Sequence, residues 1–138
     1  MTDLHANITA VTHNITRAAE AAGRDPDDIT LVAVTKTWPA DVVVAAYEAG
    51  LRHFGENRTD EFEAKQAEVT AALGEDHDAV WHYIGALQSR QTHTVADYAD
   101  VFHALDRLKI ARRLSRRLEA NGRSLPVFLE VNVSGEES

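Results

Sequence analysis

The sequence lacks several features that would each indicate a class of protein. It contains no cysteine, which excludes disulfide bonds and thiolate metal sites. No apolar run approaches the ~18 residues of a membrane-spanning helix. The first residues lack the basic region and apolar core of a secretory signal peptide, so we expect a cytoplasmic protein. Positive charge is also scarce. The net charge of −8 argues against non-specific binding to nucleic acids or anionic membranes.

Common site motifs are absent as well. The chain has no glycine-rich dinucleotide or nucleotide loop, no serine in a nucleophile elbow and no His-Glu-x-x-His. His77 and His82 do not have the spacing of metal ligands. We therefore expect no metal.

What is present is a regular alternation of predicted helices and strands in one domain, which we take to span residues 1–138 with 44% hydrophobic content. Such alternation is typical of parallel strands joined by right-handed crossovers. The hydrophobic patterns predict five helices, over 3–22, from Pro39 to 49, 59–73, about 87–98 and from an Asp106 cap to 121. They also predict five strands, over 29–36, 52–54, 80–84, 101–104 and 126–132.

Two α/β architectures fit this order: a doubly wound open sheet and a (β/α) barrel. A complete barrel has eight strands and typically ~250 residues. The chain supplies about five of those strands, so a barrel would be partial.

The central candidate is Lys36, which ends the apolar run 29–36. A parallel strand of this kind is buried and places its last residue at the edge where α/β folds carry their chemistry. Desolvation by apolar neighbours would favour the free amine, a nucleophile toward carbonyl groups. The alternative is a lysine that extends from the rim of the strand into solvent.

The other strand ends carry glycines and neutral amides. Glycines allow a flat or phosphorylated ligand to approach closely, and amides orient a ligand without adding charge. A reactive lysine in such a ring fits Schiff-base chemistry with a carbonyl compound or pyridoxal phosphate (PLP). The residues concerned are Gly55, Asn57, Ile84, Gly85, Gln88, Asn132 and Gly135.

Four polar residues also have ordinary structural interpretations. Glu56 could be an acidic residue at a helix start, and His82 could be a core histidine with one satisfied nitrogen. Glu61 precedes Lys65 by four residues, which predicts an exposed pair on a helix and makes Lys65 a surface lysine.

Four segments in order resemble the YggS/PROSC family of PLP homeostasis proteins. They are Leu-Val-Ala-Val-Thr-Lys-Thr at 31–37, Arg-His-Phe-Gly-Glu-Asn at 52–57, Trp-His-Tyr-Ile-Gly-Ala-Leu-Gln-Ser at 81–89 and Val-Asn-Val-Ser-Gly-Glu-Glu-Ser at 131–138. The match covers essentially the whole chain but only the earlier part of a family member.

The resemblance implies a TIM-type parallel barrel like the alanine racemase N-terminal domain, with about the first five strands present. It implies that Lys36 carries PLP as a Schiff base and that the protein serves intracellular PLP homeostasis without established turnover, with PLP-dependent apo-enzymes as partners. The predicted cofactor-binding residues are Lys36, Asn57, His82, Ile84, Gly85 and Asn132.

The chain departs from the family pattern in three places. Ser89-Arg90-Gln91 stands where Ser-Asn-Lys is common, and His103-Ala104-Leu105-Asp106 where His-Ser-Val-Asp is common. In the family, the residues that hold the phosphate and contact the pyridine nitrogen come from the last strands of the barrel, which residues 1–138 do not include.

Three alternatives stay open at this point. One is a fold-type III enzyme resembling a racemase or decarboxylase. Another is an aldolase-type barrel. The third is a fragment without a competent site that self-associates through exposed sheet edges.

Overall fold

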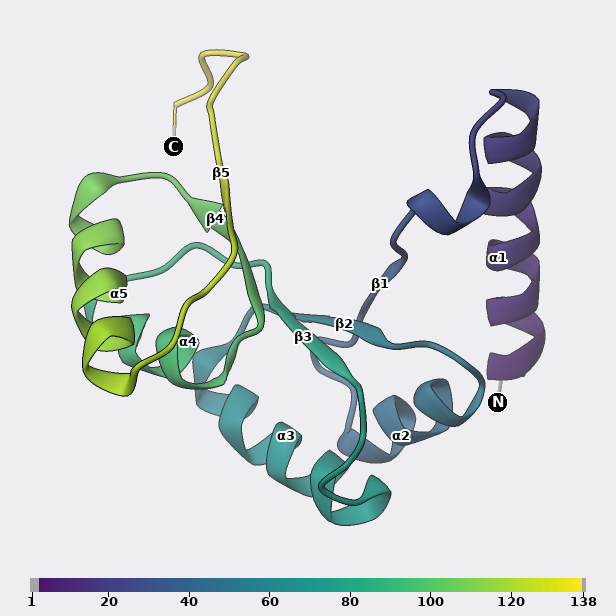
Figure 1. The fold of residues 1–138 in the computed structure, drawn as a ribbon, viewed down its shortest axis with the longest axis horizontal. Helices are drawn as coiled ribbons and strands as arrows, with labels where there is room; N and C mark the ends of the chain where they lie inside the picture. The colour runs from purple at the N-terminus through teal and green to yellow at the C-terminus, as the bar shows by residue number, and fades with distance from the viewer. Residues whose placement is uncertain (1–2, 138) are drawn as a thin grey trace.

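The computed structural model describes residues 3–137 as five parallel strands with a helix before and between them (Figure 1). Two short 3₁₀ turns, η1 and η2, precede β1 and α4. In chain order the elements are α1 (Leu4–Ala21), η1 (Pro26–Asp28), β1 (Val32–Val34), α2 (Ala40–Glu48), β2 (His53–Glu56), α3 (Thr59–Leu73), β3 (Val80–Tyr83), η2 (Ser89–Gln91), α4 (Thr92–Tyr98), β4 (Val101–Leu105), α5 (Leu108–Asn121) and β5 (Val127–Leu129).

The strand order decides between the two architectures. The sheet runs β1-β2-β3-β4-β5, and every neighbouring pair is parallel. A doubly wound sheet must reverse its order at a switch point, whereas a barrel adds each strand beside the last. The sheet is therefore part of a (β/α) barrel, as predicted.

Alternation along the strands separates two faces of the sheet. Phe54, Trp81, Tyr83 and Phe102 are buried and form one core with apolar residues of α2 to α5. Their neighbours in the strands lie on the opposite, concave face, because successive side chains point to opposite sides. That face is only partly buried within the described chain.

The open side of the sheet ends at β5, whose residues are all exposed. Phe128 is 59% and Leu129 is 74% exposed. Among residues 3–137, β5 pairs only with β4. Such an edge can pair with another strand, and the self-association expected from the sequence stays a prediction.

Several predicted boundaries need correction. The strand predicted over 29–36 is confined to β1, and the one over 126–132 to β5. The helix predicted from about 87 divides into η2 and α4. Arg107, not Asp106, occupies the N-cap of α5. In α1, the spacing of Leu4, Ile8, Val11 and Ile15 predicts one apolar stripe, but Val11 is 45% exposed.

Three histidines form a ladder across the concave face. His53 Nδ1 lies 2.9 Å from His82 Nε2, and His82 Nδ1 lies 2.8 Å from His103 Nε2. Each pair needs one N–H and one lone pair, so the ladder is fully bonded when all three rings are neutral. Phe128 stacks on His103, with ring centroids 4.9 Å apart.

The environment of the central ring opposes its protonation. Burial, followed by the charges of His103 and His53, lowers the pKa of His82 from 6.5 to about 4. In the unfolded chain the ring protonates near its ordinary value, so the unfolded state binds the proton first. The stability contributed by neutral His82 is complete above pH 6.5 and is lost as the pH falls toward about 4.

We therefore expect acid to destabilise the chain through His82, by up to about 3 kcal/mol between these pH values. Urea unfolding at a series of pH values should show a steeper loss in the wild type than in His82→Gln. His13→Gln, on the exposed side of α1, is the matched control. Equal pH dependence in the wild type and His82→Gln would contradict this assignment.

Candidate functional site

The carboxyl ends of the parallel strands form one edge, and Lys36 lies there two residues after β1. Its side chain is exposed, so the desolvation expected from the sequence is not provided by the described residues. No ion pair or side-chain hydrogen bond joins Lys36 to another of the residues 3–137. The lysine therefore offers an unpaired amine at this edge.

Asn57, Ile84 and Gly85 come together beside the ends of β2 and β3. Ile84 N donates to Glu56 O at 2.8 Å, which continues the pairing beyond β3. A Cβ on Gly85 would lie 3.0 Å from both the Cβ and the carbonyl oxygen of Asn57. Any larger residue at this position would require Asn57 to shift by a few tenths of an ångström. The three residues thus form one surface, as the convergence of strand ends predicts.

Tyr83 supports Asn57 from the helix side of the sheet. Its hydroxyl donates to Asn57 O at 3.0 Å. Burial, with a smaller contribution from the charge of Asp60, raises the pKa of Tyr83 to about 12. The phenol therefore stays protonated and serves as a fixed donor.

The side chains of two predicted site residues are engaged in other contacts. His82 is 5% exposed, and both of its ring nitrogens are engaged in the ladder rather than one. Asn132 stands three residues after β5 and is exposed. Its side chain bonds within its own loop, accepting from Gly135 N at 2.9 Å and donating to Glu136 O at 2.6 Å.

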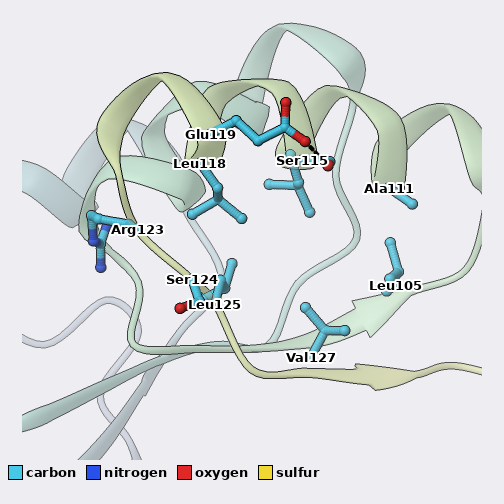
Figure 2. Close-up of a pocket in the computed structure, with 10 residues that line it drawn as sticks. Leu105, Ala111, Ser115, Leu118, Glu119, Arg123, Ser124, Leu125 and Val127 are labelled. Carbon is cyan, nitrogen blue, oxygen red and sulfur yellow. Dashed lines mark hydrogen bonds between the residues drawn. The ribbon is translucent and has the colours of Figure 1, made fainter.

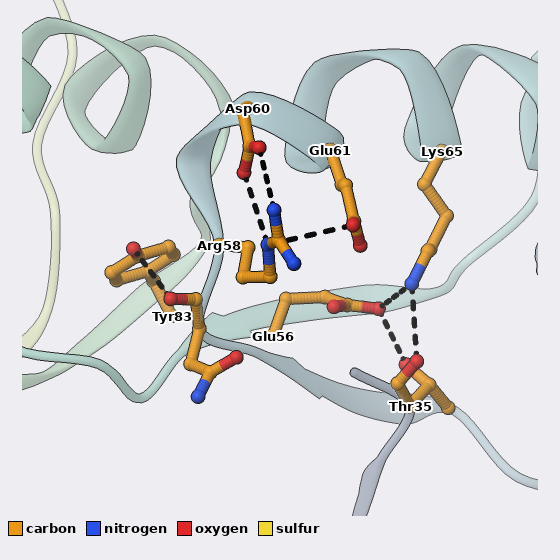
Figure 3. A network of polar contacts seen from close by, with 8 residues as sticks. Thr35, Glu56, Arg58, Asp60, Glu61, Lys65 and Tyr83 are labelled. Atoms are coloured by element: carbon orange, nitrogen blue, oxygen red, sulfur yellow. Dashed lines mark hydrogen bonds and ion pairs between the residues drawn. The ribbon is translucent and has the colours of Figure 1, made fainter. Parts of the chain in front are cut away.

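Thr35, Glu56 and Lys65 form a buried polar cluster that includes the residue directly before Lys36 (Figure 3). Lys65 reaches from α3 toward the other two. Its Nζ donates to Glu56 Oε1 at 2.6 Å and to Thr35 O at 3.0 Å, and Thr35 Oγ1 donates to the same carboxylate oxygen at 2.8 Å. Glu56 Oε2 is buried with no partner among the described residues.

This cluster corrects two predictions. Lys65 is 7% exposed rather than a surface lysine, and Glu61 pairs instead with Arg58 at 3.4 Å. Glu56 is a buried strand residue rather than an acidic residue at a helix start.

The sequence does contain a pattern that indicates the burial of both side chains, Glu56 and Lys65. Glu56 is two residues from Phe54 on one strand face, and Lys65 lies between Phe62 and Val69 on one helix face.

Two hollows of different character lie among residues 3–137. One of about 300 Å³ lies between α5 and strands β4 and β5 (Figure 2). Its lining combines four leucines, an alanine and Val127 with four polar residues, and it is remote in the sequence from Lys36. The other, of about 540 Å³, is polar and lies between the start of α3 and the segment 90–94. Asn57 lines this second hollow, which therefore adjoins the candidate site.

The sequence matches one family model and several curated relatives. The family model for the alanine racemase N-terminal domain matches residues 6–137. A pyridoxal phosphate homeostasis protein of Pseudomonas aeruginosa is 47% identical over all of this chain and 58% of its own length. One of Escherichia coli is 39% identical, again over all of this chain and 58% of the relative.

Solved structures give a similar result. PipY of Synechococcus elongatus, solved with PLP bound, is 38% identical with a TM-score of 0.74, over 88% of this chain and 56% of PipY. A protein of unknown function from Bifidobacterium adolescentis has a TM-score of 0.87 at 35% identity, over 98% of this chain and 57% of the other.

The chain thus spans somewhat more than half the length of these relatives. Across residues 3–137, none of the helices has the length and apolar character needed to span a bilayer. The family model covers nearly the whole chain, and the curated relatives share one description. The chain therefore belongs to the alanine racemase N-terminal domain family, and these relatives confirm the resemblance to YggS/PROSC proteins carried by its four motifs.

Proposed function

We propose that this chain binds PLP through a Schiff base on Lys36 and holds the cofactor for PLP homeostasis. The observation that carries the proposal is the unpaired amine of Lys36 at the carboxyl edge of a barrel-type sheet. The PLP-bound structure of PipY, at 38% identity, supports the choice of ligand. PLP-dependent apo-enzymes are the recipients that such a carrier would serve.

The covalent step is the condensation of an amine with an aldehyde. The neutral Nζ of Lys36 would supply both the electron pair for the new C=N bond and its two N–H protons, which would leave with the aldehyde oxygen as one molecule of water. PLP, when bound, supplies the aldehyde and an electron-withdrawing ring. The chain supplies the amine and the surface that orients the ring.

The lysines of the chain differ sharply in availability, which makes the assignment specific. The sequence has three: Lys36, Lys65 and Lys109. Lys65 is buried and its amine is used by Glu56 and Thr35. Lys109 is exposed near the start of α5. Lys36 is exposed and follows β1, which pairs with the strand that leads to Asn57, whereas Lys109 lies four residues after β4.

The residues present fit the aldehyde end of PLP. Gly85 leaves room against Asn57, and the Asn57 amide adds hydrogen-bonding capacity without charge. Ile84 adds an apolar side chain that could contact the PLP ring. We assign cofactor contact to these three residues together with Lys36. His82 supports the site through its hydrogen bonds to the other two histidines of the ladder. Asn132 contributes its side-chain amide from the loop after β5.

The surrounding groups favour holding a cofactor over turnover. A racemase needs a group that takes a proton from the substrate. Among the described residues at this edge, Tyr83 is buried and bonded to Asn57, with its pKa raised to about 12. His82 has both nitrogens occupied and a pKa near 4. Neither is suited to the role of a base near neutral pH.

We expect PLP followed by borohydride to label the chain on Lys36. Peptide mapping should find the added mass on the peptide containing residue 36 and lose it in Lys36→Ala. Lys109→Ala, which removes an exposed lysine after β4 and not beside β1 and β2, should leave the labelling of Lys36 unchanged. Equal labelling of Lys36 and Lys109, or labelling that survives Lys36→Ala, would contradict the proposal.

Gly85→Ala tests the surface beside the lysine. The added Cβ at 3.0 Å from Asn57 must displace that residue, so we expect weaker PLP binding and a stability loss of about 1–3 kcal/mol. Titration of PLP with absorbance detection measures the first effect, and urea unfolding measures the second. Ala10→Gly in exposed α1, which costs about 1 kcal/mol, controls for stability alone. Unchanged affinity in Gly85→Ala would remove Asn57 and Gly85 from the site.

A further inference from the structure

The buried polar cluster of Thr35, Glu56 and Lys65 has features that packing of the core alone does not require. Glu56 is fully buried and Lys65 nearly so, and removing two charges from water carries a desolvation penalty that their attraction only partly repays. An apolar pair of similar volume would often stabilise a fold as well. Glu56 Oε2 also lacks a partner among the described residues, a further cost.

Every polar group of Thr35, the residue before Lys36, is hydrogen-bonded. Thr35 Oγ1 donates to Glu56 Oε1, and Thr35 N donates to Gly55 O at 3.0 Å. The Thr35 carbonyl accepts from Lys65 Nζ at 3.0 Å and from Trp38 N at 3.1 Å. Thr35 thus has no free hydrogen-bonding group with which to adopt another conformation.

The residue after Lys36 has an unusual backbone. Thr37 has φ +66°, and among the described residues no other non-glycine has a positive φ. A β-branched residue in this region is strained and persists only where its surroundings enforce it. Lys36 therefore stands between a residue bonded at all its polar groups and one held in a strained turn.

We propose that Glu56 and Lys65 are positioning residues for Lys36: by bonding Thr35 from the helix side, they set the direction in which the Lys36 amine leaves the sheet. The proposal rests on the proposed function, because it concerns the amine that forms the Schiff base. Lys65 contributes in a second way, since its own amine is held away from the aldehyde by Glu56 and Thr35.

The positioning role of Glu56 and Lys65 can be tested separately from their contribution to the stability of the fold. Glu56→Gln or Lys65→Met alone leaves one buried charge without its partner and should lower the unfolding midpoint strongly. The double variant Glu56→Gln/Lys65→Met has no buried charge, so its midpoint should return toward the wild type. It still lacks the donor to the Thr35 carbonyl, and the direction of Lys36 should not recover.

The readout is the ratio of PLP labelling at Lys36 to that at Lys109 after brief exposure and borohydride reduction, quantified by peptide mass. Lys109 is an internal control for reagent and exposure. We expect the ratio to be well above one in the wild type and to fall between about tenfold and 100-fold in the double variant, as misplacement of a reacting group does. Lys65→Arg, which keeps the charge and the donors, should retain most of the ratio.

Two further variants complete the test. Thr35→Val keeps the shape of the side chain and the ion pair but removes the hydroxyl bond, so it should fold and lower the ratio. Arg117→Met breaks an exposed ion pair with Asp97 on the far helices and should leave the ratio unchanged.

A stable double variant with the wild-type ratio, or Thr35→Val with the wild-type ratio, would overturn the positioning role. A wild-type chain that labels Lys36 no faster than Lys109 would instead overturn the proposed function. The two failures are therefore distinguishable.

Discussion

The buried ion pair between Glu56 and Lys65 is the interaction on which the rest of the structure depends. It joins β2 to α3, and through Thr35 it joins both to the end of β1. Loss of either charge would leave the other uncompensated in the core, at a cost of about 3–5 kcal/mol. The pair therefore constrains the three elements that surround the candidate site, and Lys36 follows directly from the constrained residue.

The parallel sheet turns this local constraint into a site. Because all five strands run the same way, the residues that follow β1, β2 and β3 reach the same edge. Alternation places the aromatic core against the helices and the histidine ladder on the concave face. The helix side thus supplies rigidity, while the strand ends present the Lys36 amine, Asn57 and Gly85.

The fold could be predicted from the sequence because its signals are local and repeated. Short apolar runs between amphipathic segments indicated parallel strands, and the structure confirms each of the five, though β1 and β5 are shorter than the apolar runs that contain them. The choice of a barrel over a doubly wound sheet depends on strand order. That order is a long-range property, and the motif resemblance indicated it where hydrophobic periodicity could not.

The candidate site was predictable only in part. Placement of Asn57 beside Gly85 follows from the rule that strand ends converge, and the structure bears it out. The burial of Lys65 was missed because a helical pair with Glu61 also satisfies the local pattern. Which carboxylate a lysine reaches depends on how α3 packs on β2, and no spacing within α3 records that. The exposure of Lys36 likewise depends on what covers the concave face, which the run before it does not indicate.

The most direct test of this account is nuclear magnetic resonance of the chain with isotopically labelled lysine side-chain nitrogens. The three lysines give a small set of signals that can be assigned by single substitutions. On addition of PLP, the Lys36 nitrogen alone should acquire the chemical shift of an imine, while the nitrogens of Lys65 and Lys109 keep their shifts. An imine signal from Lys109 or Lys65 of comparable intensity, or none from Lys36, would contradict it.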